Sequence, residues 1–202
     1  MTSFHPLTKK RWPDFERLFG AHGAYCGCWC MYWRGTRREF GARQGEGNRK
    51  AMKKIVDSGQ VPGILAYAGG EPVGWCSVGP RGDFPSLNRS PVLKPLDELP
   101  VWSIVCFYIA KGYRGKGLAQ DLVRAAVGYA RRNGGRIVEA YPTEPRGRSL
   151  APVSSYMGVP SVFLRAGFVE CARPSKCKTV MRYYIQEVKD RGSAEPGSEL
   201  RT

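Results

Sequence analysis

The stretch Tyr113-Arg-Gly-Lys-Gly-Leu-Ala119 lies between the most apolar run of the chain, Val101–Ala110, and its clearest amphipathic helix, expected over 118–132. The apolar run predicts a strand that is covered on both faces, and the helix is predicted from apolar residues that recur at helical spacing. Glycines at the junction let backbone N–H groups converge without interference from Cβ atoms. Because a helix N-terminus carries partial positive charge, the junction is expected to bind an anionic phosphate.

Two common phosphate-binding motifs do not match this junction. A Walker loop would need glycine at position 110 and serine or threonine at 117, where the chain has Ala110 and Gly117. A dinucleotide fingerprint would need a third glycine at position 120, where the chain has Gln120. Neither motif explains the stretch.

The order of elements around the junction predicts an α/β domain. A second strand is expected over 136–141, so strand, helix and strand form a βαβ unit whose two strands are parallel and adjacent. The other expected elements are helices over 12–20, 47–58 (with Asn48 as N-cap) and 158–166, a hairpin of 63–68 and 72–78, and paired strands over 168–172 and 177–185.

Composition favours a single soluble domain over residues 1–187, followed by a polar tail over 188–202 that is expected to be disordered. The chain has 202 residues, 42% of them hydrophobic, and no apolar run approaches the length of a membrane span. Its N-terminus lacks the apolar region of a secretory signal, so a cytoplasmic location is expected. The 7 cysteines are then expected to be reduced thiols.

The net charge of +15 favours acidic partners such as nucleic acid or phosphorylated ligands. No ribonucleoprotein, zinc-finger or basic-zipper pattern supports nucleic-acid binding, which stays an alternative. No membrane partner is expected.

The junction also fits the pattern Arg114-x-x-Gly117-x-Ala119. This pattern resembles the pyrophosphate-binding signature of the GNAT superfamily of acetyl-CoA-dependent N-acetyltransferases. The segment Val162-Phe-Leu-Arg-Ala-Gly-Phe168 resembles the late helix of that family, and the resemblance extends over about 60–185. It implies an α/β GNAT fold: a mixed, twisted sheet of about six or seven strands, about four flanking helices, and a splayed pair of parallel central strands. Residues 1–59 would then form a helical segment on the acceptor side.

The resemblance implies that acetyl-CoA is the co-substrate and that a primary amine of an acceptor attacks it directly in a ternary complex. Whether the acceptor is a small molecule or a protein is left open. The backbone of 115–119 would hold the CoA pyrophosphate, and Ile109 with its neighbours would pair with the pantetheine arm. No metal is expected, and a homodimer is left open. The residues implied in CoA binding are Phe107, Tyr108, Ile109, Arg114, Gly115, Lys116, Gly117, Leu118 and Ala119.

Two residues are candidates for proton transfer. Many members of the family place a tyrosine four residues before the late Gly167 to protonate the departing CoA, but here that position holds Phe163, which has no hydroxyl. Tyr156 is a candidate substitute, the alternative being a packing role. Glu139 lies in the middle of a predicted strand, where a charge is unusual, and is a candidate base. The alternative is a buried ion pair with an arginine.

The segment Tyr25–Trp33 is rich in aromatic and sulfur-containing residues. Cys26, Cys28 and Cys30 alternate, but structural zinc sites more often use two separated cysteine pairs, so metal binding is not expected. Tyr25, Trp29, Tyr32 and Trp33 are expected either to shape the acceptor pocket or to form core, and Asp97 is a candidate for binding a substrate cation. Cys106, in the apolar run, is interpreted as a core residue.

Two functional alternatives to the transferase remain. An acyl-CoA sensor without turnover would explain the absence of a hydroxyl at Phe163. A basic nucleic-acid-binding protein would explain the charge. Formation of an acetylated product distinguishes an enzyme from the acyl-CoA sensor. Nucleic-acid binding that weakens steeply with salt and is unaffected by CoA identifies the nucleic-acid-binding protein.

Overall fold

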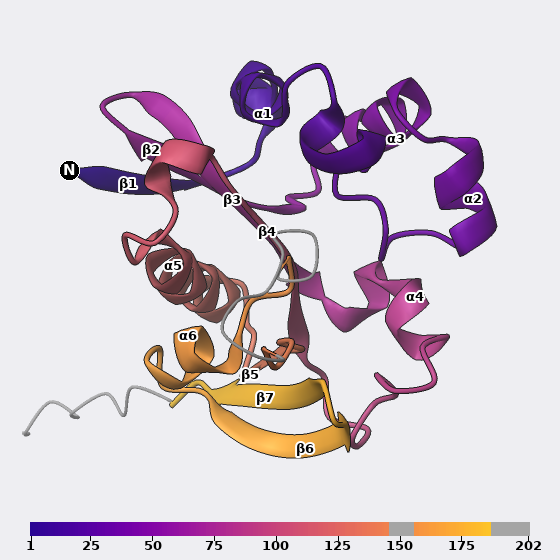
Figure 1. The fold of residues 1–202 in the computed structure, drawn as a ribbon, viewed down its shortest axis with the longest axis vertical. Helices are drawn as coiled ribbons and strands as arrows, with labels where there is room; N and C mark the ends of the chain where they lie inside the picture. Colours follow the sequence, from indigo (N-terminus) through magenta and orange to yellow (C-terminus); the bar gives the residue numbers. More distant parts are fainter. Residues whose placement is uncertain (146–155, 187–202) are drawn as a thin grey trace, which may run out of the picture.

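The computed structural model describes residues 1–145 and 156–186, and the predicted tail over 188–202 lies outside them. Seven strands form one sheet in the order β1-β2-β3-β4-β5-β7-β6, with helices on both faces (Figure 1). The strands are β1 Thr2–Pro6, β2 Gly63–Ala68, β3 Glu71–Pro80, β4 Trp102–Ile109, β5 Ile137–Ala140, β6 Val169–Ser175 and β7 Lys178–Tyr184. The helices are α1 Trp12–Phe19, α2 Arg37–Ala42, α3 Glu46–Asp57, α4 Pro85–Asn88, α5 Leu118–Arg132 and α6 Pro160–Leu164.

The mixed sheet with a parallel β4–β5 pair confirms the fold predicted from the sequence. These strands pair only from Trp102 to Ile104, opposite Val138 to Ala140, although β4 continues to Ile109. Beyond Ile104 the two strands separate. In this splayed region the backbone N–H of Phe107 donates a hydrogen bond to the carbonyl of Tyr156, with an N···O distance of 2.6 Å. The splay therefore opens at the centre of the sheet.

The side chains of the central strands alternate between the two faces of the sheet, and each face packs into a separate core. On β3, Cys76 packs on the face covered by α5, whereas Trp75 packs on the face covered by α1 and α3. The second core contains an aromatic cluster of Trp12, Phe15, Phe19, Trp29 and Trp75, whose rings lie within 6.5 Å of a neighbour in the cluster. This cluster anchors the segment between α1 and α2 to the sheet.

The structure differs from the sequence predictions at a few elements. Strand β1 and the short helices α2 and α4 were not expected, so within the described residues there are six α-helices rather than about four. Asn48 lies inside α3 and does not cap it. Its side chain is buried and donates to the carbonyls of Gly27 and Phe40, so a polar residue is used here to join α3 to the preceding loop.

None of the helices in the described part of the chain is long and apolar enough to cross a membrane.

Candidate active site

A cavity of about 1020 Å³ lies where β4 and β5 splay, and it extends from the N-terminus of α5 to the segment between α1 and α2. Segments that are far apart in the sequence therefore contribute to one site. Its lining residues are Phe19, Ala24, Tyr25, Cys26, Cys28, Tyr32, Phe40, Cys106, Phe107, Tyr108, Ile109, Tyr113, Arg114, Gly115, Gly117, Leu118, Ala119, Gln120, Tyr156, Val162 and Arg165.

One end of the cavity is the glycine junction before α5. Gly115 and Gly117 have φ values of +73° and +83°, which favour glycine, and a Cβ built on either would meet no atom within 4 Å. No side chain caps the start of α5, where the first N–H groups of a helix lack intrahelical partners, and Gly117, Leu118 and Ala119 line the cavity. Arg114 and Arg165 add positive charge to the lining. This end is thus suited to a phosphate.

Eight of the nine residues implied in CoA binding line this cavity. They are Phe107, Tyr108, Ile109, Arg114, Gly115, Gly117, Leu118 and Ala119. Lys116 is not among the lining residues, and its Nζ lies 5.8 Å from the centre of the Tyr113 ring. The Ile109 carbonyl accepts a hydrogen bond of 2.8 Å from Arg114 Nε, which ties the end of β4 to the junction.

The other end of the cavity is lined mainly by aromatic and thiol groups from the segment between α1 and α2. Of the predicted acceptor residues, Tyr25 lines it. Trp29 does not, because it is buried and stacks on Phe19 at 5.7 Å between ring centres. Trp33 packs partly buried against a third core cluster. Trp29 and Trp33 thus pack in core clusters and do not line the cavity, whereas Tyr25 and Tyr32 both line it.

The segment from Gly23 to Cys30 has an unusual backbone. Four of its residues other than glycine have positive φ: Ala24 at +69°, Cys26 at +47°, Trp29 at +42° and Cys30 at +59°. Within this segment Cys26 and Cys28 line the cavity, whereas Cys30 is buried. No periodic pattern in the sequence encodes such a conformation. Among the described residues, no three metal-binding side chains gather into a potential metal site.

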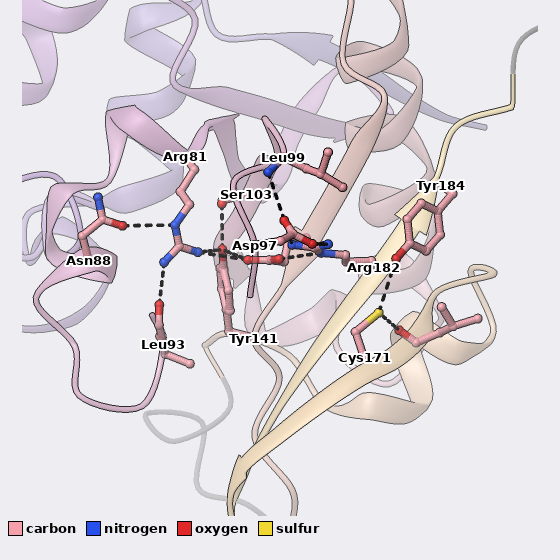
Figure 2. Close-up of polar contacts among 12 residues, drawn as sticks. Arg81, Asn88, Leu93, Asp97, Leu99, Ser103, Tyr141, Cys171, Arg182 and Tyr184 are labelled. Carbon is pink, nitrogen blue, oxygen red and sulfur yellow. Dashed lines mark hydrogen bonds and ion pairs between the residues drawn. The ribbon is translucent and has the colours of Figure 1, made fainter. Parts of the chain in front are cut away.

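Glu139 is buried, belongs to an ion network and is not among the cavity lining residues. Figure 2 shows Arg81, Tyr141 and Arg182 of this network. Its carboxylate accepts hydrogen bonds from Arg81 Nη1 at 2.9 Å and from Arg182 Nε at 2.7 Å. The hydroxyl of Tyr141 donates to it at 2.7 Å. Burial first, and then the Glu139 charge, raise the pKa of Tyr141, which keeps this hydroxyl protonated. The arrangement favours the ion-pair alternative for Glu139 over that of catalytic base.

Asp97 belongs to the same network. Its two carboxylate oxygens accept from Arg182 at 2.6 and 3.0 Å, and these hydrogen bonds lower the pKa of Asp97. Asp97 is not among the cavity lining residues. Its hydrogen bonds with Arg182 hold the loop before β4 against β7. Sequence alone places Asp97 and Arg182 too far apart to suggest this pairing.

Tyr156 lines the cavity, as its predicted role requires. Burial raises the pKa of its hydroxyl above the usual value for tyrosine, so the group keeps its proton near neutral pH. Phe163 is fully buried between Phe107 and Phe168, with ring centres 6.0 and 5.2 Å away. The position that carries tyrosine in many GNAT enzymes is here part of the core.

Cys106 was interpreted as core but is partly exposed to the cavity. It lies in the apolar run at the point where β4 leaves β5, between the pair Trp102–Ile104 and the residues implied in pantetheine binding. A cysteine in an apolar run gives no signal of this exposure. The splay of the strands causes it.

Comparison with known proteins finds a matching family model and solved structures with a similar fold. A family model described as "Acetyltransferase (GNAT) family" matches residues 14–151. No curated protein matches the chain at a significant level. An acetyltransferase of the GNAT family from Streptococcus agalactiae has a similar structure, with 14% sequence identity and a TM-score of 0.55, over 92% of this chain and 96% of that one. The PaiA N-acetyltransferase of Thermoplasma acidophilum, solved with coenzyme A, is 13% identical with a TM-score of 0.52, over 92% and 99% of the two chains.

Proposed function

Because the chain belongs to the GNAT family of acetyltransferases, we propose that it transfers an acetyl group from acetyl-CoA to a primary amine. One observation carries the proposal. The phosphate-binding junction of α5 and the splayed edge of β4 open into the same cavity of about 1020 Å³. A ligand with a pyrophosphate and a strand-like arm fits these two features together.

The cavity supports direct attack in a ternary complex. An alkylamine with a pKa near 10.4 is about one part in a thousand neutral at pH 7, so forming the free amine costs about 4–5 kcal/mol. Holding the amine against the thioester supplies a large compensating effect. Tyr156 lines the cavity and carries its hydroxyl proton near neutral pH, which supports a transfer of that proton to the departing CoA thiolate. This is the role proposed for it.

The acceptor end of the cavity favours an apolar amine. The described lining residues include Phe19, Tyr25, Tyr32, Phe40 and Tyr108 but no carboxylate or imidazole. Nothing there would compensate additional positive charges on the acceptor, and the protein itself carries a net charge of +15. We therefore propose an aromatic or aliphatic monoamine, with 2-phenylethylamine as a suitable probe and the polyamine spermidine as its contrast.

Titration of the purified protein with acetyl-CoA, at two salt concentrations, tests the proposal. We expect micromolar binding of one molecule per chain, because the junction, Arg114 and Arg165 all favour the phosphates. Moderate weakening at the higher salt is expected from screening of these charges. Isothermal calorimetry gives the affinity and the stoichiometry.

Mass spectrometry then separates the remaining functions. An acetylated 2-phenylethylamine with release of CoA supports the enzyme, and a slower reaction with spermidine supports an apolar acceptor. Binding of acetyl-CoA without any acetylated amine would instead indicate a sensor. Absence of acetyl-CoA binding at both salt concentrations, together with salt-sensitive binding of nucleic acid, would replace the transferase by the nucleic-acid alternative.

A further inference from the structure

A lysine on β7 links the residues that follow β5 to those that precede α6. Lys178 is the first residue of β7, and its ammonium donates hydrogen bonds to Thr143 Oγ1 at 2.7 Å and to the carbonyl of Tyr141 at 3.2 Å. It also donates to Met157 Sδ at 3.2 Å. Tyr141 and Thr143 follow β5, whereas Met157 precedes α6, so a single ammonium connects three parts of the chain.

The ammonium of Lys178 is held by uncharged groups. Its three acceptors among the described residues are a hydroxyl, a carbonyl and a thioether, and the carboxylate of Glu144 pairs instead with Arg173 at 3.0 Å. Burial lowers the pKa of Lys178 to about 8, so the group is still mainly charged at pH 7. Because a partly buried charge is costly without hydrogen-bond partners, the ammonium and its three acceptors hold one another in place.

Backbone hydrogen bonds reinforce the same connection. The N–H of Thr143 donates to the carbonyl of Gly158 at 2.9 Å, and the N–H of Glu144 donates to the carbonyl of Cys177 at 3.0 Å. Thr143 also pairs with Lys178 in an antiparallel bridge. The resulting joint between β5, α6 and β7 consists of Tyr141, Thr143, Met157, Gly158 and Lys178.

Tyr156 is the residue next to this joint. Its neighbour Met157 is 1% exposed and accepts the hydrogen bond from Lys178. The carbonyl of Tyr156 accepts from the N–H of Phe107 on β4, and its ring meets that of Tyr32 edge to face, with centres 6.3 Å apart. Lys178 and β4 together thus fix the backbone that carries the Tyr156 side chain into the cavity lining.

We propose that Lys178 is a positioning residue that fixes Tyr156 in the cavity for the acetyl transfer. This inference rests on the proposed function, in which Tyr156 gives its hydroxyl proton to the departing CoA thiolate. Lys178 takes no part in bond formation or proton transfer, because the three acceptors of the joint engage its ammonium and it is not among the cavity lining residues. Its loss should therefore affect the rate of transfer and not the binding of acetyl-CoA.

Lys178→Met tests this expectation, because it removes the ammonium and keeps an unbranched side chain. We expect kcat with 2-phenylethylamine at pH 7 to fall about tenfold or more, since a small displacement of a catalytic group has effects of this size. KM for acetyl-CoA should stay within about twofold of wild type, because Lys178 does not line the cavity. The matched control is Lys176→Met, since Lys176 is exposed in the turn between β6 and β7. Its kcat and KM should equal those of wild type.

A double-mutant cycle distinguishes positioning from a general loss of structure. Tyr156→Phe removes only the hydroxyl and should lower kcat about a hundredfold. If Lys178 acts through that hydroxyl, adding Lys178→Met to Tyr156→Phe should lower kcat by no more than about twofold further, because no proton donor is left to position. A purely structural role would instead multiply the two effects, and multiplied effects overturn the inference.

Fluorine NMR reports on the surroundings of Tyr156 without any activity. In protein labelled with 3-fluorotyrosine, the resonance of Tyr156 is the one that Tyr156→Phe removes. We expect this resonance to shift in Lys178→Met and to stay unchanged in Lys176→Met. An unchanged resonance in Lys178→Met overturns the inference. Circular dichroism and acetyl-CoA titration confirm that each variant is folded and binds acetyl-CoA.

Thr143→Val provides a second test should Lys178→Met fail to fold. Valine keeps the shape of the side chain but removes the acceptor of the shortest of the three hydrogen bonds, and Lys178 stays in place. We expect kcat to fall about threefold or more with KM for acetyl-CoA unchanged. Thr143→Ser keeps the hydroxyl and should retain the wild-type kcat. A Thr143→Val enzyme with the same kcat as Thr143→Ser overturns the inference.

These outcomes separate the inference from the proposed function. A wild-type protein that does not bind acetyl-CoA, or that leaves 2-phenylethylamine unmodified, counts against the function, and the fluorine resonance still decides whether Lys178 fixes Tyr156. A Tyr156→Phe enzyme with kcat within about threefold of wild type overturns the inference and leaves the transferase intact.

Discussion

Gly117→Glu is expected to weaken acetyl-CoA binding by at least about a hundredfold. The new carboxylate would stand at the N-terminus of α5, where the first N–H groups face the cavity. Two like charges 4 Å apart repel by about 4 kcal/mol at an effective dielectric of 20, and every 1.4 kcal/mol is a factor of about ten in affinity. In addition, φ of +83° at this position disfavours any side chain. Calorimetric titration measures the loss.

The matched control is Gly128→Glu on the same helix. A Cβ at Gly128 would meet only Arg132 Nη1, at an ordinary 3.6 Å. The substitution adds the same charge at the opposite end of α5, so binding should stay within about twofold of wild type after screening by salt. Equal affinities for Gly117→Glu and Gly128→Glu would show that the junction does not hold the phosphates. Unfolding midpoints of both variants report whether the fold is intact.

Glu139→Ala is expected to lower the free energy of unfolding by about 3–5 kcal/mol, because it leaves two buried or half-buried arginines without their shared anion. Arg81 and Arg182 both donate to this carboxylate, and the side chains of Arg182 and Glu139 are 4% and 1% exposed. Tyr141 would also lose its acceptor. Urea unfolding measures the change.

Glu170→Ala supplies the control for this loss. Glu170 pairs with Arg173, and these side chains are 39% and 45% exposed, so its removal should cost less than about 1 kcal/mol. Similar losses in both variants would contradict the network's role. If Glu139→Ala does not fold, Glu139→Gln keeps the volume and the hydrogen-bond acceptor. A folded Glu139→Gln that retains stability but loses its turnover would instead restore Glu139 as the catalytic base.

The sequence predicts the centre of the molecule well because the signals there are local. The glycine junction at Gly115 and Gly117, the amphipathic α5 and the apolar β4 each follow from neighbouring residues. Their order also predicts the parallel pairing of β4 with β5, which the structure confirms. The end of the cavity at the glycine junction is therefore predictable from one continuous stretch of chain.

The acceptor end is not predictable in the same way, because its residues meet only through the tertiary fold. Cys106 and Cys30 are far apart in the chain, yet Cys106 packs against the core cluster that contains Cys30. Trp29 and Tyr32 are near neighbours in the sequence, yet one is core and the other lines the cavity. The left-handed backbone between them decides which side chain turns inward. Likewise, nothing local in Glu139 or Asp97 reveals that Arg182 lies between them.

The positive φ angles of Ala24, Cys26, Trp29 and Cys30 have an energetic consequence for the cavity wall. Each such residue costs about 1–3 kcal/mol, so the four together are comparable to the whole net stability of a typical domain, about 5–15 kcal/mol. The segment keeps this shape because Trp29 is clamped between Trp12 and Phe19. This segment of the proposed acceptor site therefore stores backbone strain. On heating, we expect the segment to unfold before the sheet does.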